Sequence, residues 1–458
     1  MIENMKTLSI KSKAESKEFY KGLAIIVAPI AIQNLISSAC NSLDVVMLGS
    51  VGQTAIAATS LANQVQFILM LFFVGLGSGL SMLTSQYWGK KDYASIQILM
   101  GTALRISCAA GFIFCGATFF FPKAIMALIT NEVQLIEVGS LYLRTVSLAY
   151  FLLSVSQVYH AVLKSTEHVK TVTIITFIAL GLNLLLNAIF IYGLFGVEKM
   201  GVFGVAIATV IARSIELVIC IVFSLRVKEV RIRITNIFLR SKLLSKDFIV
   251  YSLPAVGNEF VWGAAFATYS VILGHLGEDI VAANSVVNVV RNLASILCFG
   301  MAYGGAILLG KQIGEGDLEK VKRNGKRLIK STVLAGFISA LCMIALQPLL
   351  PHIAKLSDVA SGYRNYLLYI NSYSLLGATI NTVLICGIFR AGGDAKFGFI
   401  LDTIAMWVVS IPLGLIAAFV LKLPPLAVYF ILYLDEFEKM PIVIAHYFKG
   451  NWLKDITR

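Results

Sequence analysis

Twelve long apolar runs constrain the fold of this chain more than any other feature. A helix needs about 20 residues to cross roughly 30 Å of hydrocarbon, and each run is long enough. The predicted spans are 23–49, 55–87, 97–120, 138–162, 170–196, 201–226, 247–273, 280–310, 328–350, 363–389, 397–420 and 424–447. The sequence lacks the segments of about ten residues with alternating polarity that are typical of membrane β-barrels. It therefore predicts an all-α integral membrane protein with twelve transmembrane helices.

The positive charges predict the orientation of these spans. The sequence contains 38 Lys and Arg residues and has a formal net charge of +13. Of the 38, 28 lie in the tails and in the loops 88–96, 160–172, 225–247, 311–330 and 390–396, whereas four lie in the other loops. Positive residues collect in cytoplasmic loops, so we expect a multi-pass protein of the cell membrane with both termini in the cytoplasm. The basic character then reflects topology, and we expect the lipid bilayer and no nucleic acid as a partner.

Sequence motifs argue against several functional classes. All seven cysteines lie in apolar runs without Cys-x-x-Cys spacing, so neither a disulfide framework nor a zinc site is predicted. The chain has no Gly-Lys-Ser phosphate loop and no Gly-x-Ser-x-Gly elbow, which argues against an ATP-driven pump and a hydrolase. We expect a protein that is not an enzyme, has no cofactor and draws its energy from an ion gradient. A membrane-embedded enzyme stays open as an alternative.

The two halves of the chain repeat each other. The segment 45–92 aligns with 270–317 without a gap and with 14 identities in 48 positions, and the same offset places Pro29 on Pro254. After the fourth span, an offset longer by one position aligns Lys164 with Arg390. Parallel repeats of six spans are one layout of secondary transporters, in which the substrate site lies between the halves. A duplication that only enlarged the bundle, or a duplicated channel or membrane enzyme, would show the same pattern.

The repeat predicts two pseudo-symmetric six-helix bundles. We expect a cytoplasmic N-terminal tail at 1–22, an N-lobe at 23–226, a cytoplasmic linker at 227–246, a C-lobe at 247–447 and a cytoplasmic C-terminal tail at 448–458. We expect the monomer to be the functional unit.

Carboxylates inside the apolar runs are the most informative residues, because an unpaired charge near the bilayer centre costs several kcal/mol. Asp44, Glu259 and Asp402 lie well inside their spans. Glu216 lies three residues from Arg213, a spacing that favours a local salt bridge. Asp44 and Glu259 have no opposite charge at helical spacing, so a proton, a cation or another helix must neutralise each of them. A buried acid capped by a hydroxyl or an amide is the alternative.

The fifth span carries two asparagines on one face, because Asn183 and Asn187 are four residues apart. Together with an acid they would form a polar pocket, although interhelical hydrogen bonding alone also explains them. Another charged stretch, YLDEFEKMP at 433–441, ends the twelfth span. We interpret it as approaching the cytoplasmic surface, where it would meet the basic loops.

Several motifs resemble those of a known family. They are SLDVVMLGSVG at 42–52, SQYWGKKD at 85–92, NLLLN at 183–187, LPAVGNEFVW at 253–262 and FRAGGDAKF at 389–397. In this order and spacing, the chain resembles the multidrug and toxic compound extrusion (MATE) family along nearly its whole length. The resemblance implies two bundles of six helices in a V, opening alternately to the two sides. It also implies export of small amphipathic, often cationic compounds in exchange for H⁺ or Na⁺.

The resemblance implies a coupling site in the N-lobe. Asp44 matches the family's first-span acid, and Asn183 and Asn187 match its fifth-span partners. Thr209 is similar to a sixth-span hydroxyl. These four residues are the predicted cation-coupling site, with Na⁺ as a possible ion at Asp44, Asn183 and Asn187.

The resemblance is weaker in the C-lobe. The family's seventh-span Glu falls on Trp262, one turn beyond Glu259, and its tenth-span acid falls on Thr379, which puts a C-lobe cation site in doubt. The predicted second-lobe polar site comprises Glu259, Asn258, Thr379 and Asp402, and the predicted substrate cavity includes Gln33, Asn34 and Trp262.

A flippase or exporter of lipid-linked oligosaccharide or polysaccharide, from the same superfamily, is the alternative function. It should present several basic residues to its cavity, and only Arg105, Arg144, Arg213 and Arg291 lie well inside spans. Convergence of Arg105, Arg144 and Arg291 on one cleft would favour this alternative.

Overall fold

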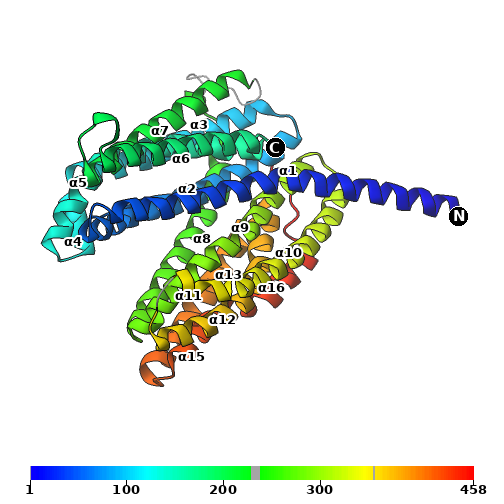
Figure 1. Ribbon diagram of the computed structural model, residues 1–458. Coiled ribbons are helices and arrows are strands. Elements are labelled where there is room, and N and C mark those ends of the chain that lie inside the picture. Colours follow the sequence, from blue (N-terminus) through cyan, green and yellow to red (C-terminus); the bar gives the residue numbers. More distant parts are fainter. Residues whose placement is uncertain (1, 228–237, 354–355) are drawn as a thin grey trace. The chain divides into compact units, whose positions relative to one another are not determined.

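The computed structural model describes residues 2–227, 238–353 and 356–458. All the regular structure in these ranges is helical (Figure 1), as the apolar runs predict. Residues 228–237 of the predicted linker lie outside the described ranges.

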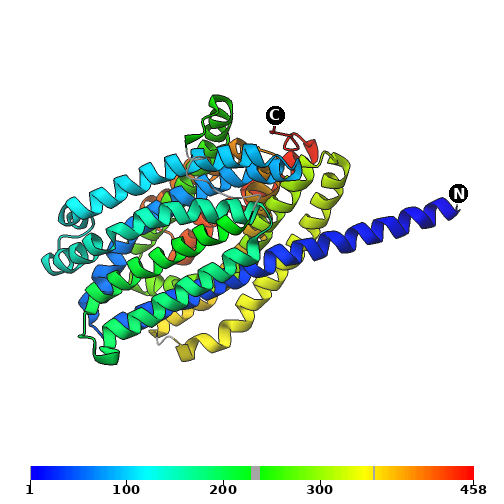
Figure 2. The same cartoon turned by 90° about the horizontal axis from the view of Figure 1, so that it is seen from above.

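The first half of the chain contains six long helices. They are α1 (Ile2–Gly49), α2 (Gln53–Gly89), α3 (Tyr93–Phe120), α5 (Val133–Ser165), α6 (Val169–Tyr192) and α7 (Gly201–Arg226), with the short elements α4 (Pro122–Ile129) and η1 (Leu194–Gly196) between them. Local signals fix several ends. Asp92 caps α3 by accepting a hydrogen bond from the Ser95 amide, and Gly193 ends α6 with a left-handed φ of 73°. α1 starts far before the predicted span and is the long helix at the N-terminus in Figure 2.

The helices in the second half of the chain are interrupted more often than those in the first half. It contains α8 (Lys242–Gly274), α9 (Glu278–Gly314), α10 (Leu318–Leu346), η3 (Gln347–Leu349), α11 (Leu350–Ile353), α12 (Asp358–Thr382), η4 (Val383–Phe389), α13 (Ala395–Asp402), η5 (Thr403–Ser410), α14 (Ile411–Leu415), η6 (Ile416–Val420), α15 (Pro425–Leu432) and α16 (Asp435–Lys449). The segments η4, η5 and η6 are π-helical. Such segments are rare and often mark functional sites.

Ten of the described helical stretches are long and apolar enough to cross a membrane. The other two predicted spans are α8, which carries Pro254 and the polar pair Asn258 and Glu259, and the last span. That last span was predicted as one run, but it is broken between α15 and α16. With these two, the chain has twelve spans in two sets of six, an all-α membrane architecture.

Two compact units divide the described chain at repeat-related positions. One comprises 1–31, 85–90 and 257–458, and the other 32–84 and 91–256. α1 changes unit after Ala31 and α8 after Val256, and the repeat places these two residues on each other. Each follows a proline, Pro29 or Pro254, by two residues. The duplicated prolines therefore lie next to the points where both helices change unit.

Paired glycines explain why parts of the repeat are identical. In one unit, a Cβ on Gly79 of α2 would lie 2.5 Å from the Cα of Ser252 in α8. In the other unit, a Cβ on Gly304 of α9 would lie 2.7 Å from Cγ2 of Val27 in α1. The repeat places Gly79 on Gly304 and Val27 on Ser252. Only glycine allows these helices to approach so closely, and the same contact recurs in both units.

Candidate functional site

Four polar side chains of α1, α6 and α7 form a connected group, which we name the first-lobe cluster: Asp44, Asn183, Asn187 and Thr209. The amide of Asn187 donates to Asp44 Oδ1 at 2.9 Å and lies 3.4 Å from Asn183 Oδ1. The amide of Asn183 donates to Thr209 Oγ1 at 3.4 Å. The structure thus brings together all four residues of the predicted coupling site.

Asp44 is neutralised only weakly. Its side chain is half-buried, and within the described ranges no Lys, Arg or His forms an ion pair with it. Its hydrogen bond comes from a neutral amide. Asn187 is buried, and its own Oδ1 meets no donor among the described residues. The cluster therefore presents a carboxylate and an unpaired amide oxygen, a combination that suits a proton or a small hard cation.

The helix register assembles this cluster. Asn183 and Asn187 are four residues apart and so lie on one face of α6. Gly204 lets α7 pack closely on that helix, since a Cβ there would lie 2.6 Å from Cβ of Phe190. Thr209, five residues further along α7, is then within reach of Asn183.

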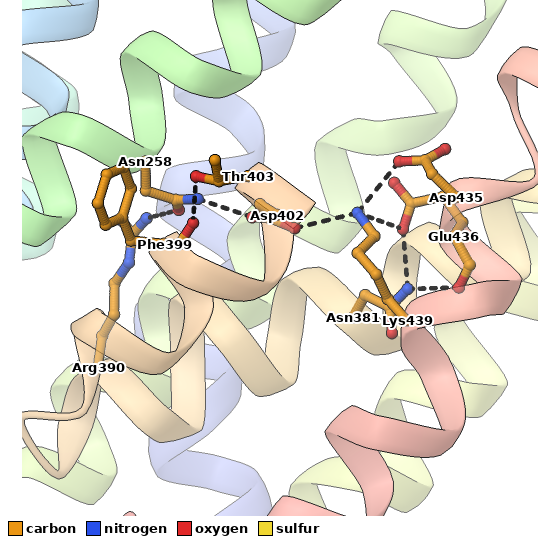
Figure 3. Close-up of polar contacts among 9 residues, drawn as sticks. All are labelled: Asn258, Asn381, Arg390, Phe399, Asp402, Thr403, Asp435, Glu436 and Lys439. Atoms are coloured by element: carbon orange, nitrogen blue, oxygen red, sulfur yellow. Dashed lines mark hydrogen bonds and ion pairs between the residues drawn. The ribbon is translucent and has the colours of Figure 1, made fainter. Parts of the chain in front are cut away.

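A larger group occupies the second half, and we name it the second-lobe cluster: Asp402, Asp435, Glu436 and Lys439. Figure 3 shows the Lys439 ammonium between the three carboxylates. Its Nζ lies 3.1 Å from Asp402, 3.2 Å from Asp435 and 3.5 Å from Glu436. Asn381 of α12 also donates to Glu436 Oε2 at 2.8 Å. All four members are buried, with exposed fractions of 7% or less.

A second ion pair adjoins this cluster. Arg390, directly after η4, lies 3.1 Å from Glu259 Oε1 and donates to Asn258 Oδ1 at 2.7 Å. The amide of Asn258 in turn donates to Asp402 Oδ2 at 2.7 Å. One asparagine therefore joins the two groups of charges (Figure 3).

The predicted surface position of the 433–441 stretch was wrong. Asp435 and Lys439 are 2% and 3% exposed and face Asp402 inside the unit. The physical reason is mutual neutralisation, because three carboxylates and an ammonium compensate much of each other's desolvation. Asp435 and Glu436 also lie in the first turn of α16, where the helix dipole favours negative charge.

The structure connects three of the four predicted second-lobe residues. Glu259 is neutralised by Arg390 from another helix, and Asn258 and Asp402 join the same network. Thr379 is not part of this network in the part of the chain that the structure describes; its hydroxyl donates to the Leu375 carbonyl at 2.7 Å. Sequence reasoning missed Arg390 and Lys439 as site residues. Their signal was present, since Arg390 directly follows the predicted span 363–389 and Lys439 is a basic residue inside the predicted span 424–447.

The predicted cavity residues are found in both units. Gln33 donates to Thr176 Oγ1 at 3.0 Å, and Asn34, beside it on α1, is half-buried. Trp262 of α8 packs on Phe266 with ring centroids 4.6 Å apart and is 36% exposed. Their role in a substrate cavity stays a prediction.

One polar contact is repeated in both lobes. The repeat places Gln33 on Asn258, and its longer offset, which aligns Lys164 with Arg390, places Thr176 on Asp402. Gln33 donates to Thr176, and Asn258 donates to Asp402. The C-lobe therefore has a carboxylate where the N-lobe has a hydroxyl.

The arginines inside spans have separate local partners. Arg105 donates to Thr102 at 3.0 Å, whereas Arg144 lies over the ring of Phe119 at 5.1 Å. Thr102 and Phe119 lie in opposite halves of α3, roughly 25 Å apart at about 1.5 Å per residue. Arg213 pairs with Glu216 at 2.7 Å, as its spacing predicted.

Arg291, in the other unit, lies over the ring of Tyr433 at 4.7 Å. Because Arg105 and Arg144 contact opposite parts of α3, the three do not form the convergent basic group that the flippase alternative requires.

Comparison with known proteins identifies the family. The MatE family model matches residues 29–189 and 254–416, well over half of the chain, and its two matches begin at the prolines that the repeat pairs, Pro29 and Pro254. The chain belongs to the MatE family. It is thus a MATE transporter, a multi-pass membrane protein of a family of transporters.

Relatives and solved structures agree with this assignment. The chain is 23% identical to the probable multidrug resistance protein YoeA of Bacillus subtilis, covering 98% of both chains. It is 26% identical to the probable multidrug resistance protein NorM of Pasteurella multocida, covering 86% of this chain and 85% of the relative.

A multidrug resistance MATE family transporter in an outward-facing conformation matches with a TM-score of 0.84 at 19% identity, covering 94% of each chain. The eukaryotic MATE transporter AtDTX14 matches with a TM-score of 0.83 at 14% identity, covering 96% of this chain and 97% of that one. These similarities show the fold.

Proposed function

We propose that this MATE transporter exports small amphipathic, often cationic organic compounds in exchange for H⁺ or Na⁺, with Asp44 as the coupling residue. The observation that carries the proposal is the state of Asp44: a half-buried carboxylate with one neutral amide donor and no ion pair in the described ranges. Such a charge is costly within a membrane unless a cation or proton neutralises it.

We expect coupling because the ion and the cationic substrate compete for the negative charge of Asp44. When Asp44 binds a proton or Na⁺, its negative charge is neutralised and a cationic substrate loses its electrostatic attraction. When the ion leaves, the carboxylate attracts the substrate. Exchange requires only that the two ligands bind alternately, because a ligand shifts an equilibrium by its differential affinity for the two states.

The first-lobe cluster offers suitable ligands for either ion. Asp44, Asn183 and Thr209 contribute carboxylate, amide and hydroxyl oxygens, which are hard donors, and Asn187 Oδ1 is a further oxygen with no donor in the described ranges. A proton on Asp44 would need fewer of these oxygens than Na⁺. Substitution of Asn183 therefore helps to distinguish the two ions.

We further propose that the protein works as a monomer in the cell membrane, with both termini in the cytoplasm. The distribution of Lys and Arg supports this orientation. The separate contacts of Arg105 and Arg144 disfavour the flippase alternative.

Efflux in a pump-deficient strain tests the coupling residue. Cells that express the wild-type protein should export ethidium or norfloxacin, and cells that express Asp44→Asn should not, because the amide cannot change its charge. Glu438→Gln is the matched control, since Glu438 is an exposed acid with no place in either cluster. Undiminished efflux by Asp44→Asn at equal protein level would remove Asp44 from the mechanism.

Proteoliposomes with separately imposed pH and Na⁺ gradients identify the ion. A proton-coupled protein responds to the pH gradient alone, and a Na⁺-coupled protein to the Na⁺ gradient alone. Transport that ignores both gradients would contradict antiport.

A further inference from the structure

We propose that the second-lobe cluster is a proton-binding site, in which about one exchangeable proton is held by Asp435 and Glu436 at the break between α15 and α16. The residues differ from those of the coupling site proposed above, and the inference does not rest on the role of Asp44.

The charge balance of the region is the first argument. Three buried carboxylates surround one ammonium, that of Lys439. Two further cations face the region: Arg390, which pairs with Glu259, and Arg291, which lies over Tyr433 and interacts electrostatically with Asp435 and Glu436. With Glu259 included, the region has four acids and three cations, so one negative charge remains.

The other titratable groups facing the cluster do not compensate that charge. They are the phenols of Tyr269 and Tyr433, the thiols of Cys298 and Cys386, and the exposed carboxyl group of Glu438, which interacts with Lys439 and adds no positive charge. Phenols and thiols are neutral or become negative on titration, and they are uncharged near neutral pH. An uncompensated buried carboxylate is strongly unfavourable, and in practice such a group takes up a proton.

Unpaired acceptors are the second, independent argument. Asn381 is 2% exposed and its amide donates to Glu436, yet its Oδ1 meets no donor among the described residues. Asp435 Oδ2 has only the Lys439 ammonium, 3.2 Å away, as a partner in the described ranges, and it shares that ammonium with Asp402 and Glu436. The site therefore contains more acceptors than donors. A proton converts one carboxylate oxygen into a donor and reduces that deficit.

A proton suits this site better than a metal ion. Lys439 already places a positive charge among the carboxylates, and within the described ranges no group of three or more His, Cys, Asp or Glu side chains has metal-binding geometry. Asp402 is held by Lys439 and by the Asn258 amide. The proton therefore belongs to the Asp435 and Glu436 pair.

The backbone around the second-lobe cluster contains several interruptions of regular α-helix. Asp435 begins α16 after a helix break, Asp402 immediately precedes the π-helical η5, and Asn381 lies two residues before the π-helical η4. Ion sites in transporters are typically formed by discontinuous helices. Uptake or loss of the proton changes the net charge at the junction of these segments.

Infrared titration of the purified full-length transporter tests the site directly. Asp44→Asn serves as the background, so that the first lobe contributes no carboxyl signal. We expect a pH-dependent carbonyl band of a protonated carboxyl group, equivalent to about one proton per molecule, that disappears in Asp44→Asn/Asp435→Asn. Glu438→Gln, an exposed acid on the same helix, should leave the band unchanged, and Asp435→Glu should retain a shifted band.

The result can also refute the proposal. The absence of a titrating band in the Asp44→Asn background, or a band that survives both Asp435→Asn and Glu436→Gln, would overturn it. If Asp435→Asn does not yield folded protein by gel filtration, Glu436→Gln in the same background provides the test. Because no transport is measured, this outcome is independent of whether Asp44 couples export.

Discussion

The two polar clusters neutralise their acids in different ways. In the first lobe, Asp44 accepts one hydrogen bond from an amide and has no ion pair in the described ranges. In the second lobe, Asp402, Asp435 and Glu436 share the ammonium of Lys439, and Glu259 pairs with Arg390. The charge of a lone acid can be neutralised by a single proton or cation. An ion-pair network mainly stabilises the fold and tolerates only a small change in its net charge. The comparison assigns exchange with the transported cation to the first lobe.

The largest expected effect is the loss of the only ammonium in the second-lobe cluster. Lys439→Met leaves three buried carboxylates without their common partner. Removing one partner of a buried ion pair costs about 3–5 kcal/mol, so we expect a much lower yield of folded protein and a lower melting temperature in detergent.

A second substitution should partly reverse that loss. Lys439→Met with Asp402→Asn removes one of the unpaired charges, so the double variant should be more stable than Lys439→Met alone. If Lys439→Met is as stable as wild type, the ammonium does not hold this cluster together.

In the first lobe, Asp44→Asn should change stability by less than about 1 kcal/mol, because no ion pair is broken.

The asparagines of the two lobes provide a matched pair of intermediate effect. Asn258→Ala removes the bridge between Arg390 and Asp402, and we expect a loss of about 1–3 kcal/mol of stability, the cost of leaving buried polar groups unpaired. Asn187→Ala removes the single donor to Asp44 and should weaken ion coupling more than stability. Melting curves and gradient-driven uptake measure the two properties. A larger loss of stability from Asn187→Ala and a larger loss of coupling from Asn258→Ala would contradict the roles assigned to the two lobes.

The smallest effect is expected outside both clusters, at the C-terminal tail. Partial burial raises the pKa of Asp455, but hydrogen bonds from Thr457 and the ion pair with Lys90 at 3.0 Å lower it by more, so the net pKa lies below the usual value. The stability from a lowered carboxyl pKa is present at neutral pH and is lost as pH falls through the folded-state value.

Asp455→Asn should therefore cost less than about 1 kcal/mol at neutral pH, because the pair is largely exposed. The difference from wild type should vanish in acid. Melting temperatures measured across a pH series would show this convergence, and a difference that grows in acid would contradict the assigned pairing.

The sequence predicted the spans and the first-lobe cluster well, for physical reasons. Hydrocarbon thickness sets span length, and the shared helix face of Asn183 and Asn187 follows from their spacing. The resemblance to the MATE family added Asp44 and Thr209 as their partners. Two features of the second lobe were not predicted: which of a proton, a cation or another helix neutralises Glu259, and the burial of the charged stretch at 433–441. The pairing of Glu259 with Arg390 and the burial of Asp435 and Lys439 depend on residues 131 and 37 positions away in sequence. Periodicity cannot indicate such contacts.

The internal repeat of the sequence also relates one cross-helix contact in each lobe. Aligning Asn258 with Gln33 and Asp402 with Thr176 places the equivalent cross-helix contact in both lobes. Once the contact of Gln33 with Thr176 is known, that alignment also connects α8 with α13. The helix break at Tyr433 and Leu434 had no comparable signal, because neither residue disfavours a helix.

Ion release on substrate binding tests the central claim most directly. Purified transporter at a fixed ion concentration is mixed with ethidium, and the released protons or Na⁺ are measured with an indicator dye or ion electrode. We expect release from wild type and from Glu438→Gln, and none from Asp44→Asn although that protein remains folded. Equal release from Asp44→Asn and wild type would contradict the exchange of substrate and cation at this carboxylate.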